Sequence, residues 1–407
     1  MNKIEKKVAI IGGGPAGLFC AQLLTSAGIY TVLFDHMDPP GKKFILAGLS
    51  GGLNITNSLP LDKFCRNYYG HEKLFRQLLE DFSPADLENW CHQMGSSTFR
   101  GNGGKIFTEK PAYMILSRWL SELESSGCFQ LKTGYSLKRI TDENNLVFTA
   151  EGKEVCFHPD SAVFAMGGGS RSNTGSDGKW LKIFNERGIE TVPLKPSNCG
   201  FTVCWSPFLQ EKFSKDPESQ QISVHFAGHQ SKGEIVFTPY GIEGSGIYSI
   251  SHFIREEIEK NGKCNAELDI VPDLDIRQLK EKMARPIEKM TLSNYMKKTL
   301  KISGIKFMLM KELLKPAELS DIRKRPEIIK SLKLGICAPR PLEEAISSAG
   351  GITFQELDEN FMLKKIPGFY AIGEMADWEA PTGGFMLQGC FSTAFRAASD
   401  IIKRMKV

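Results

Sequence analysis

Short apolar runs that end on glycine recur along the chain, and apolar positions at helical spacing lie between them. The runs span residues 8–11, 161–166 and 369–372, and glycine follows each of them directly. The first is followed by a helical pattern that reaches about Ala27, and a further run over residues 30–34 ends at an aspartate. Continuous apolar runs of this length are typical of strands buried on both faces. Together with the helical patterns they predict an α/β fold with a parallel sheet.

The first run opens into the sequence GGGPAG at residues 12–17, between a predicted strand and a predicted helix. This is the fingerprint of a dinucleotide-binding unit. Gly12 lets the chain turn, Gly14 leaves room for a pyrophosphate, and Gly17 lets helix and strand pack closely. The acid at the end of the second strand accepts hydrogen bonds from ribose hydroxyls, as in FAD or NAD. We therefore predict cofactor contacts from Gly12, Gly14, Pro15, Ala16, Gly17 and Asp35.

Two glycine-rich stretches, residues 41–48 and 50–57, interleave glycine with amide and hydroxyl side chains. So many glycines predict a loop wrapped closely around a ligand rather than a packed helix. A plain surface loop is the alternative. The cofactor contacts predicted here are Lys42, Lys43, Gly51, Gly52 and Thr56.

The C-terminal part of the chain carries a second set of glycines. The strand predicted over residues 369–372 ends on Gly-Glu, and Thr-Gly-Gly at residues 382–384 opens an apolar helix over residues 385–398. FAD is long and needs a second attachment of this kind, whereas NAD does not, and the helix would direct its positive end at the flavin. The sequence has no second fingerprint, so NAD(P)H as a transient reductant has no visible site. The contacts predicted here are Gly167, Gly168, Gly373, Glu374, Asp377, Gly383, Gly384, Phe385 and Gln388.

The pattern of apolar and polar residues changes after the prolines at positions 193 and 196. Short alternating runs bounded by turns then predict an antiparallel β-rich insertion, and helical patterns follow from about residue 275. We predict an FAD-binding domain over residues 1–192 and 345–407. A β-rich substrate domain is predicted over 193–272 and 334–344, and a basic helical domain over 273–333.

Composition narrows the class of protein. The 407 residues are 41% hydrophobic and 24% charged, which is typical of a soluble globular protein. The first seven residues are polar and the apolar run behind them is short, so we expect no membrane segment and a cytoplasmic protein. The ten cysteines lack C-x-x-C or metal-ligand spacing, which predicts reduced thiols, no metal site and no redox-active dithiol.

The positive charge is concentrated in one segment. Residues 277–333 hold 16 Lys and Arg against 6 Asp and Glu, a local excess of ten, although the whole chain carries only +4. This segment is either a solvated helical face or a surface that contacts phosphates or an acidic substrate.

Several motifs together resemble the BaiN/RdsA-like family of FAD-dependent oxidoreductases, which includes aminoacetone-oxidase-like flavoproteins. They are GGGPAG, GKKFILAG, SGGLNITN, FTPYGIEGSG, AGGI and the long GFYAIGEMADWEAPTGGFMLQGCFSTA. The resemblance implies a glutathione-reductase-type FAD domain interrupted by a β-rich domain and a small helical domain. Three departures bear on the substrate side. Many members carry Arg-Cys where this chain has Gly52-Leu53, His before Tyr240, and arginine in place of Lys105.

We therefore expect an FAD-dependent oxidoreductase in which the flavin exchanges hydride with a substrate. The resemblance implies reduction of an unsaturated bond, in a ribosomal RNA uridine or a small enone, or else oxidation of a small amine. A flavin- or RNA-binding protein without turnover is a further alternative, and the basic segment favours RNA. Asn54, Lys105 and Tyr240 are the candidate catalytic residues, with loop stabilisation as their alternative role. No Ser/His/Asp or Cys/His constellation supports a hydrolase, and the oligomeric state stays open.

Overall fold

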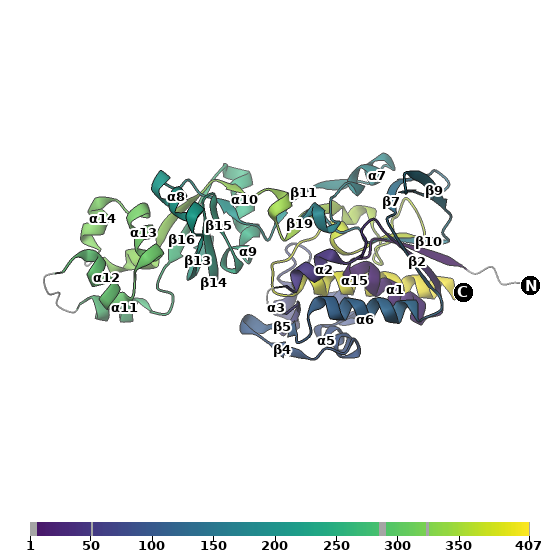
Figure 1. Cartoon of the computed structure of the whole chain (residues 1–407), viewed down its shortest axis with the longest axis horizontal. Coiled ribbons are helices and arrows are strands. Elements are labelled where there is room, and N and C mark those ends of the chain that lie inside the picture. The colour runs from purple at the N-terminus through teal and green to yellow at the C-terminus, as the bar shows by residue number, and fades with distance from the viewer. Residues whose placement is uncertain (1–5, 50–51, 285–289, 323–324, 407) are drawn as a thin grey trace, which may run out of the picture. The chain divides into compact units, whose positions relative to one another are not determined.

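The computed structural model describes residues 6–49, 52–284, 290–322 and 325–406, and it forms two compact units (Figure 1). Unit 1 consists of Met1–Pro196 and Ile346–Val407, and unit 2 of Ser197–Ala345. The chain thus enters unit 1, passes through all of unit 2 and returns. The predicted α/β class with an inserted β-rich part is confirmed. The further separation of a helical domain from the β-rich one stays a prediction.

A five-stranded parallel sheet organises unit 1. Its order is β20-β10-β1-β2-β6. Its strands are β1 (Lys7–Ile11), β2 (Tyr30–Asp35), β6 (Phe129–Thr133), β10 (Ser161–Phe164) and β20 (Phe369–Ala371). Ile11 lies opposite Phe164, and Phe164 opposite Ala371. The glycines that follow these three strands therefore leave the sheet at the same edge, which is where open α/β sheets bind ligands.

Helices and three small sheets surround this sheet. The helices are α1 (Pro15–Ser26), α2 (Lys42–Ala47), α3 (Leu61–Cys65), α4 (Glu72–Asp81), α5 (Pro84–Gln93), α6 (Ala112–Glu124), α7 (Trp180–Glu186) and α15 (Phe385–Met405). Figure 1 shows α15, in yellow, beside α1, and the two helices pack against each other. The small sheets are β3 (Asn54–Asn57) with β5 (Lys105–Thr108) and β4 (Thr98–Arg100), β7 (Ser136–Ile140) with β8 (Leu146–Ala150) and β9 (Lys153–Phe157), and β11 (Thr191–Ser197) with β19 (Ser347–Ile352).

The first helix follows from its sequence. Gly14 is the N-cap and Pro15 the first residue, where a missing N–H costs nothing. The helix ends at Ser26 with Ala27 as its C-cap, as the pattern predicts, and Gly28 continues in the left-handed region with φ 76°.

The expectation of a continuous loop over residues 41–57 is wrong. Residues 42–47 form α2 and residues 54–57 form β3. The glycines lie at the ends of the helix, with Gly41 as a left-handed N-cap at φ 74° and Gly48 as the C-cap. The six residues between them contain no glycine, so nothing in them opposes a helix.

Unit 2 is built on a seven-stranded antiparallel sheet of order β17-β16-β13-β14-β15-β12-β18. Its strands are β12 (Phe201–Thr202), β13 (Glu218–Phe226), β14 (His229–Thr238), β15 (Gly241–Glu243), β16 (Cys264–Asp269), β17 (Leu332–Ile336) and β18 (Ala338–Pro339). Its helices are α8 (Pro207–Lys215), α9 (Ser245–Tyr248), α10 (Ser251–Asn261), α11 (Ile276–Met283), α12 (Leu292–Leu300), α13 (Gly304–Leu313) and α14 (Pro316–Asp321). Sheet and helices share one hydrophobic core. Across both units, the described helices include none with the length and apolar character that crossing a bilayer requires.

Candidate functional site

The fingerprint glycines occupy three different environments. A Cβ added to Gly12, at φ 107°, would lie 2.3 Å from the carbonyl oxygen of Ala165, and one on Gly17 would lie 1.9 Å from that of Gly12. A Cβ on Gly14 would meet no atom within 4 Å. The outer two glycines therefore let strand and helix close on each other, while the middle one faces open space in front of the N-terminus of α1. This is the arrangement that accommodates a pyrophosphate.

Asp35 ends β2 beside this turn. Its Oδ2 accepts a hydrogen bond of 2.6 Å from the backbone N–H of Gly13, and its Oδ1 accepts one of 2.7 Å from that of Met37. Burial raises the pKa of Asp35, and these two hydrogen bonds oppose the rise. Each carboxylate oxygen keeps capacity for a further donor, so the residue suits the ribose hydroxyls of an adenosine.

Three distant segments meet at Glu374, which lies in the 3-10 turn Gly373–Met375 that follows β20. Glu374 Oε2 forms an ion pair of 3.1 Å with Lys43 Nζ, which also donates to Ser170 Oγ at 2.8 Å. Glu374 Oε1 accepts a hydrogen bond of 2.8 Å from the backbone N–H of Ser348. A Cβ on Gly168 would lie 1.7 Å from Ser348 Oγ, so only glycine lets these segments close. The structure thus brings together the predicted residues Lys43, Gly168 and Glu374; Ser170 and Ser348 have no local sequence signal that could have found them.

The N-terminus of α15 packs on β3. Gly384 is the N-cap at φ 95°, and a Cβ there would lie 2.3 Å from the carbonyl oxygen of Thr56. Thr56 Oγ1 donates a hydrogen bond of 2.7 Å to Gln388 Oε1, and Gln388 Nε2 donates to the carbonyl of Phe82 at 3.0 Å. Both side chains are fully buried and use protein partners, so their assignment to the cofactor stays a prediction. Phe385, beside them, packs edge-on against Phe64.

Asn57 joins the start of α15 to another part of unit 1. Its Nδ2 donates hydrogen bonds of 3.2 Å to the carbonyl oxygens of both Gly383 and Gly103. Gly103 lies in the turn between β4 and β5. Sequence reasoning did not assign Asn57, although its place in the SGGLNITN motif could have drawn attention to it.

The remaining predicted contacts surround these groups. Gly167, at φ 71°, follows β10, and Gly373, at φ 66°, precedes Glu374. A Cβ on Gly373 would approach the side chain of Ala16 at 3.0 Å. Lys42 starts α2, and its charge opposes the rise that burial causes in the pKa of Asp35. Gly52 has φ 115°, and Gly51 lies outside the described residues.

Asp377 lies beside His71, a residue that sequence reasoning missed. Burial raises the pKa of Asp377, and the nearby His71 partly offsets this rise. Burial lowers the pKa of His71, whose ring packs against Phe354 with centroids 4.6 Å apart. A polar, partly buried pair of this kind has no signal in either local sequence because 306 positions separate its members.

Two of the three candidate catalytic residues share one small sheet. Asn54 begins β3 and Lys105 begins β5. Within the described part of the chain, both amide atoms of Asn54 are buried and lack a hydrogen-bond partner. Each buried polar group without a hydrogen bond lowers the stability of the folded protein by about 1–3 kcal/mol. A buried amide of this kind therefore indicates a ligand or another partner.

Tyr240 belongs to unit 2 and is already engaged there. Its hydroxyl donates a hydrogen bond of 3.0 Å to Glu243, and the guanidinium of Arg340 lies 3.9 Å from its ring centroid. Burial raises its pKa, and the Glu243 carboxylate adds to this effect. These contacts favour the structural role that the sequence left open for Tyr240.

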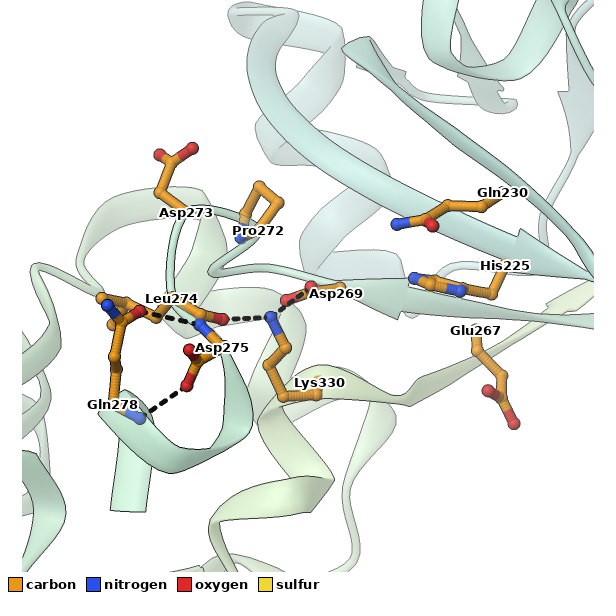
Figure 2. A pocket seen from close by; sticks show the side chains of 10 residues that line it. All are labelled: His225, Gln230, Glu267, Asp269, Pro272, Asp273, Leu274, Asp275, Gln278 and Lys330. Atoms are coloured by element: carbon orange, nitrogen blue, oxygen red, sulfur yellow. Dashed lines mark hydrogen bonds and ion pairs between the residues drawn. The ribbon is translucent and has the colours of Figure 1, made fainter. Parts of the chain in front are cut away.

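Unit 2 also contains an open hollow of about 570 Å³ beside β16 (Figure 2). Figure 2 shows two of its carboxylates, those of Asp269 and Asp275, directed at groups of the chain itself. Asp269 pairs with Lys330 at 2.5 Å, and Lys330 also donates to the carbonyl of Leu274. Asp275 accepts from the backbone N–H of Gln278, which caps α11. We therefore assign these residues to the stability of unit 2 and no ligand to this hollow.

The helices of unit 2 carry exposed cations without acidic partners. Five of these lysine and arginine side chains are exposed and form no ion pair with any described residue. They lie on α11 and at the C-terminal end of α12 and are Arg277, Lys280, Lys297, Lys298 and Lys301. Of the other basic residues singled out in this segment, Arg323 and Lys324 lie outside the described residues, and Arg325 is exposed.

A parallel sheet with a glycine fingerprint and a second glycine-lined attachment defines an FAD-binding Rossmann oxidoreductase. The chain belongs to the HI0933-like family, because the family model described as "HI0933-like protein Rossmann domain" matches residues 6–400. The resemblance to BaiN/RdsA-like flavoproteins is thereby confirmed, and the protein is a flavoprotein oxidoreductase.

Two characterised relatives align over nearly the whole chain. A ribosomal RNA dihydrouridine synthase of Escherichia coli (strain K12) is 25% identical over 97% of this chain and 97% of that protein. A 3-dehydro-bile acid delta(4,6)-reductase of Clostridium scindens is 23% identical over 98% of this chain and 99% of that protein. The fold is also similar to that of a 3-ketosteroid-delta4-(5alpha)-dehydrogenase from Rhodococcus jostii RHA1. Their TM-score is 0.53 at 14% identity, covering 99% of this chain and 98% of that one.

Proposed function

We propose that the protein is an FAD-dependent reductase of a carbon–carbon double bond, and that its substrate is a uridine in ribosomal RNA. The observation that carries the choice of RNA is the exposed basic surface of α11 and α12, whose cations have no ion-pair partner within the described parts of the chain. Lysines and arginines without acidic partners are what a phosphate backbone requires. The relative that acts on ribosomal RNA supports the same choice. NAD(P)H is the proposed reductant, binding transiently.

In this proposal, the chain's own residues would provide the cofactor site. Gly14 and the N-terminus of α1 would receive the pyrophosphate, and Asp35 would bind the adenosine ribose. The Lys43–Glu374 pair and Gly168 would line the middle of the dinucleotide. The positive end of α15 would stabilise negative charge on the ring system. FAD, when bound, supplies the hydride for the reduction.

Asn54 and Lys105 are the proposed substrate-side groups. Among the described residues, neither the nitrogen nor the oxygen of the Asn54 amide has a hydrogen-bond partner. A donor nitrogen beside an acceptor oxygen matches the adjacent carbonyl and N–H of a uracil edge. A small enone whose only polar group is its carbonyl could accept a hydrogen bond from the Asn54 amide nitrogen, but it would leave the Asn54 amide oxygen without a donor. Reduction adds a hydride to one carbon and a proton to its neighbour. Lys105 is the candidate donor of this proton.

The direct test starts from the purified yellow protein. NADH or NADPH should bleach the flavin under anaerobic conditions, and uridine-containing ribosomal RNA should restore its colour while dihydrouridine appears in the nucleoside digest. Nucleoside mass spectrometry of a deletion strain should show the loss of one dihydrouridine. Restoration of colour by a small enone but not by RNA would contradict the proposal, and rapid oxidation by air with peroxide release would indicate an oxidase.

The basic surface can be tested separately through its dependence on salt. Neutralising three lysines of α12 and its C-cap should weaken RNA binding and reduce the slope of log affinity against log salt by about 2, at roughly 0.7 per phosphate contact. Binding without any dependence on salt would remove the basis for RNA. The test variant changes Lys297, Lys298 and Lys301 to alanine, and the matched control changes three exposed lysines of unit 1: Lys153, Lys182 and Lys403.

A further inference from the structure

The hairpin of β4 and β5 presents an open aromatic surface next to the candidate site. Phe99 lies directly opposite Phe107 in the antiparallel ladder, so both side chains leave the same face of the sheet. Their rings stack with centroids 5.5 Å apart and an interplanar angle of 18°. A Cβ on Gly101 would lie 2.7 Å from the Phe107 ring, so this ring is held against the backbone. Phe99 is 44% exposed and covers Phe107 on the outside.

The same face carries the two candidate substrate-side residues. Asn54 of β3 lies opposite Phe107, which places Asn54, Phe107 and Phe99 in one row across the three strands. Lys105 precedes Phe107 by two residues, and side chains two apart in a strand share a face. The row therefore leads from the Asn54 amide, which has no partner among the described residues, to the exposed Phe99 ring, with the Lys105 ammonium group beside it.

The turn of the hairpin is tied to the cofactor side of unit 1. Asn57 Nδ2 binds the carbonyl of Gly103 in the turn and that of Gly383 before α15. The backbone N–H of Ser58 donates a hydrogen bond of 2.8 Å to the carbonyl of Gly104. These bonds hold the hairpin against the segment that precedes α15, so its aromatic face has a defined place next to the proposed flavin position.

The charge around the hairpin suits a polyanion. In the described residues, neither Lys105 nor the exposed Arg100 has an ion-pair partner. The nearby acids are Glu109, which is exposed, and Glu88, which accepts a hydrogen bond from Thr98. An exposed aromatic ring next to unpaired cations is the combination by which proteins bind unstacked bases of single-stranded nucleic acid.

We propose that the β4–β5 hairpin is the RNA-binding wall of the site, with Phe99 stacking on an unpaired base next to the target uridine while Arg100, at the end of β4, binds a flanking phosphate. The proposal rests on the proposed function, because it names how that RNA is held. A folded duplex would not offer its bases to Phe99, so the ligand is a single-stranded loop or bulge. The stack of Phe99 on Phe107 provides a rigid platform that loses little freedom on binding.

The test measures binding of a fluorescently labelled, single-stranded, uridine-containing RNA to the FAD-loaded protein. Phe99→Ala should weaken binding by about 5- to 150-fold, the range for loss of one stacked base, while Phe99→Trp should restore it. Phe208→Ala is the matched control, because Phe208 is 66% exposed but lies on α8 of unit 2. Arg100→Ala should reduce the salt slope by about 0.7. Flavin content and melting temperature should stay at the wild-type values.

The outcomes separate the hairpin from the proposed function. If the wild-type protein binds and reduces RNA while Phe99→Ala and Arg100→Ala bind it equally well, the hairpin proposal is overturned and the function stands. If the wild-type protein reduces an enone and binds no RNA, the proposed function fails and the hairpin proposal with it. Equal losses with Phe208→Ala would show a non-specific surface effect and overturn the proposal as well.

Discussion

Gly14 and Gly17 lie three residues apart in one motif, yet their substitution should have opposite consequences. Gly14 has φ −76° and ψ 179°, which any residue adopts, and a Cβ there meets no protein atom within 4 Å. Gly14→Val gains about 0.4–1 kcal/mol from the reduced entropy of the unfolded chain and loses about 1 kcal/mol because valine is a poor N-cap. The stability of the FAD-free protein should therefore change by less than about 1 kcal/mol, and its melting temperature by a few degrees at most.

Binding of FAD should nevertheless be lost in Gly14→Val, because the side chain fills the space in front of α1. FAD at 100 times its dissociation constant stabilises a protein by about 2.7 kcal/mol, which corresponds to a rise in melting temperature of about 5–11 °C at this domain size. The wild type should show this shift and the variant none. The assay is a thermal melt of the stripped protein with and without added FAD, together with the flavin absorbance of the purified protein.

Gly17→Ala provides the contrast. Its Cβ would lie 1.9 Å from the carbonyl oxygen of Gly12, so the helix must move and the FAD-free protein should lose about 1–3 kcal/mol. A Gly14→Val protein that keeps full flavin content and the full shift would refute this assignment of the phosphate position. A Gly14→Val protein as unstable as Gly17→Ala would show that the open space is part of the packing.

Three further results are expected. Burial lowers the pKa of His71 in the folded protein, so below the ordinary histidine pKa of about 6.5 the unfolded state binds more protons than the folded state. The stability of the protein should therefore fall as the pH drops through this value, and melting curves of His71→Gln should show a smaller fall. Gln388→Leu should cost about 1–3 kcal/mol in urea unfolding because it leaves buried groups unpaired, and a double-mutant cycle with Thr56→Val should show coupling, whereas additive losses would contradict the hydrogen bond between them. The Sγ atoms of Cys204 and Cys337 lie 3.2 Å apart, so diamide should oxidise the two thiols to a disulfide, detected as a mass loss of two hydrogens that either single serine variant abolishes.

Much of unit 1 could be predicted from the sequence because its motifs are local. The turn at Gly12, the open position at Gly14 and the acid at Asp35 each follow from a few neighbouring residues whose backbone requirements are strict. The same holds for the start of α1 at Pro15. Helix α2 does not follow from the number of glycines around it, because their positions decide: Gly41 and Gly48 cap the helix, and its interior contains no glycine.

The sequence by itself determined that the chain holds a dinucleotide and that its second glycine set favours FAD, since each glycine motif constrains the backbone within a few residues. Only the tertiary structure decided which side chains meet. Lys43 and Glu374 form an ion pair although 331 positions separate them in the sequence. Asn57 forms hydrogen bonds with Gly103 and Gly383, so three distant segments of the chain meet there. The row of Asn54, Phe107 and Phe99 depends on the register of three strands. Such contacts follow from packing and register across the whole unit, which no local pattern specifies.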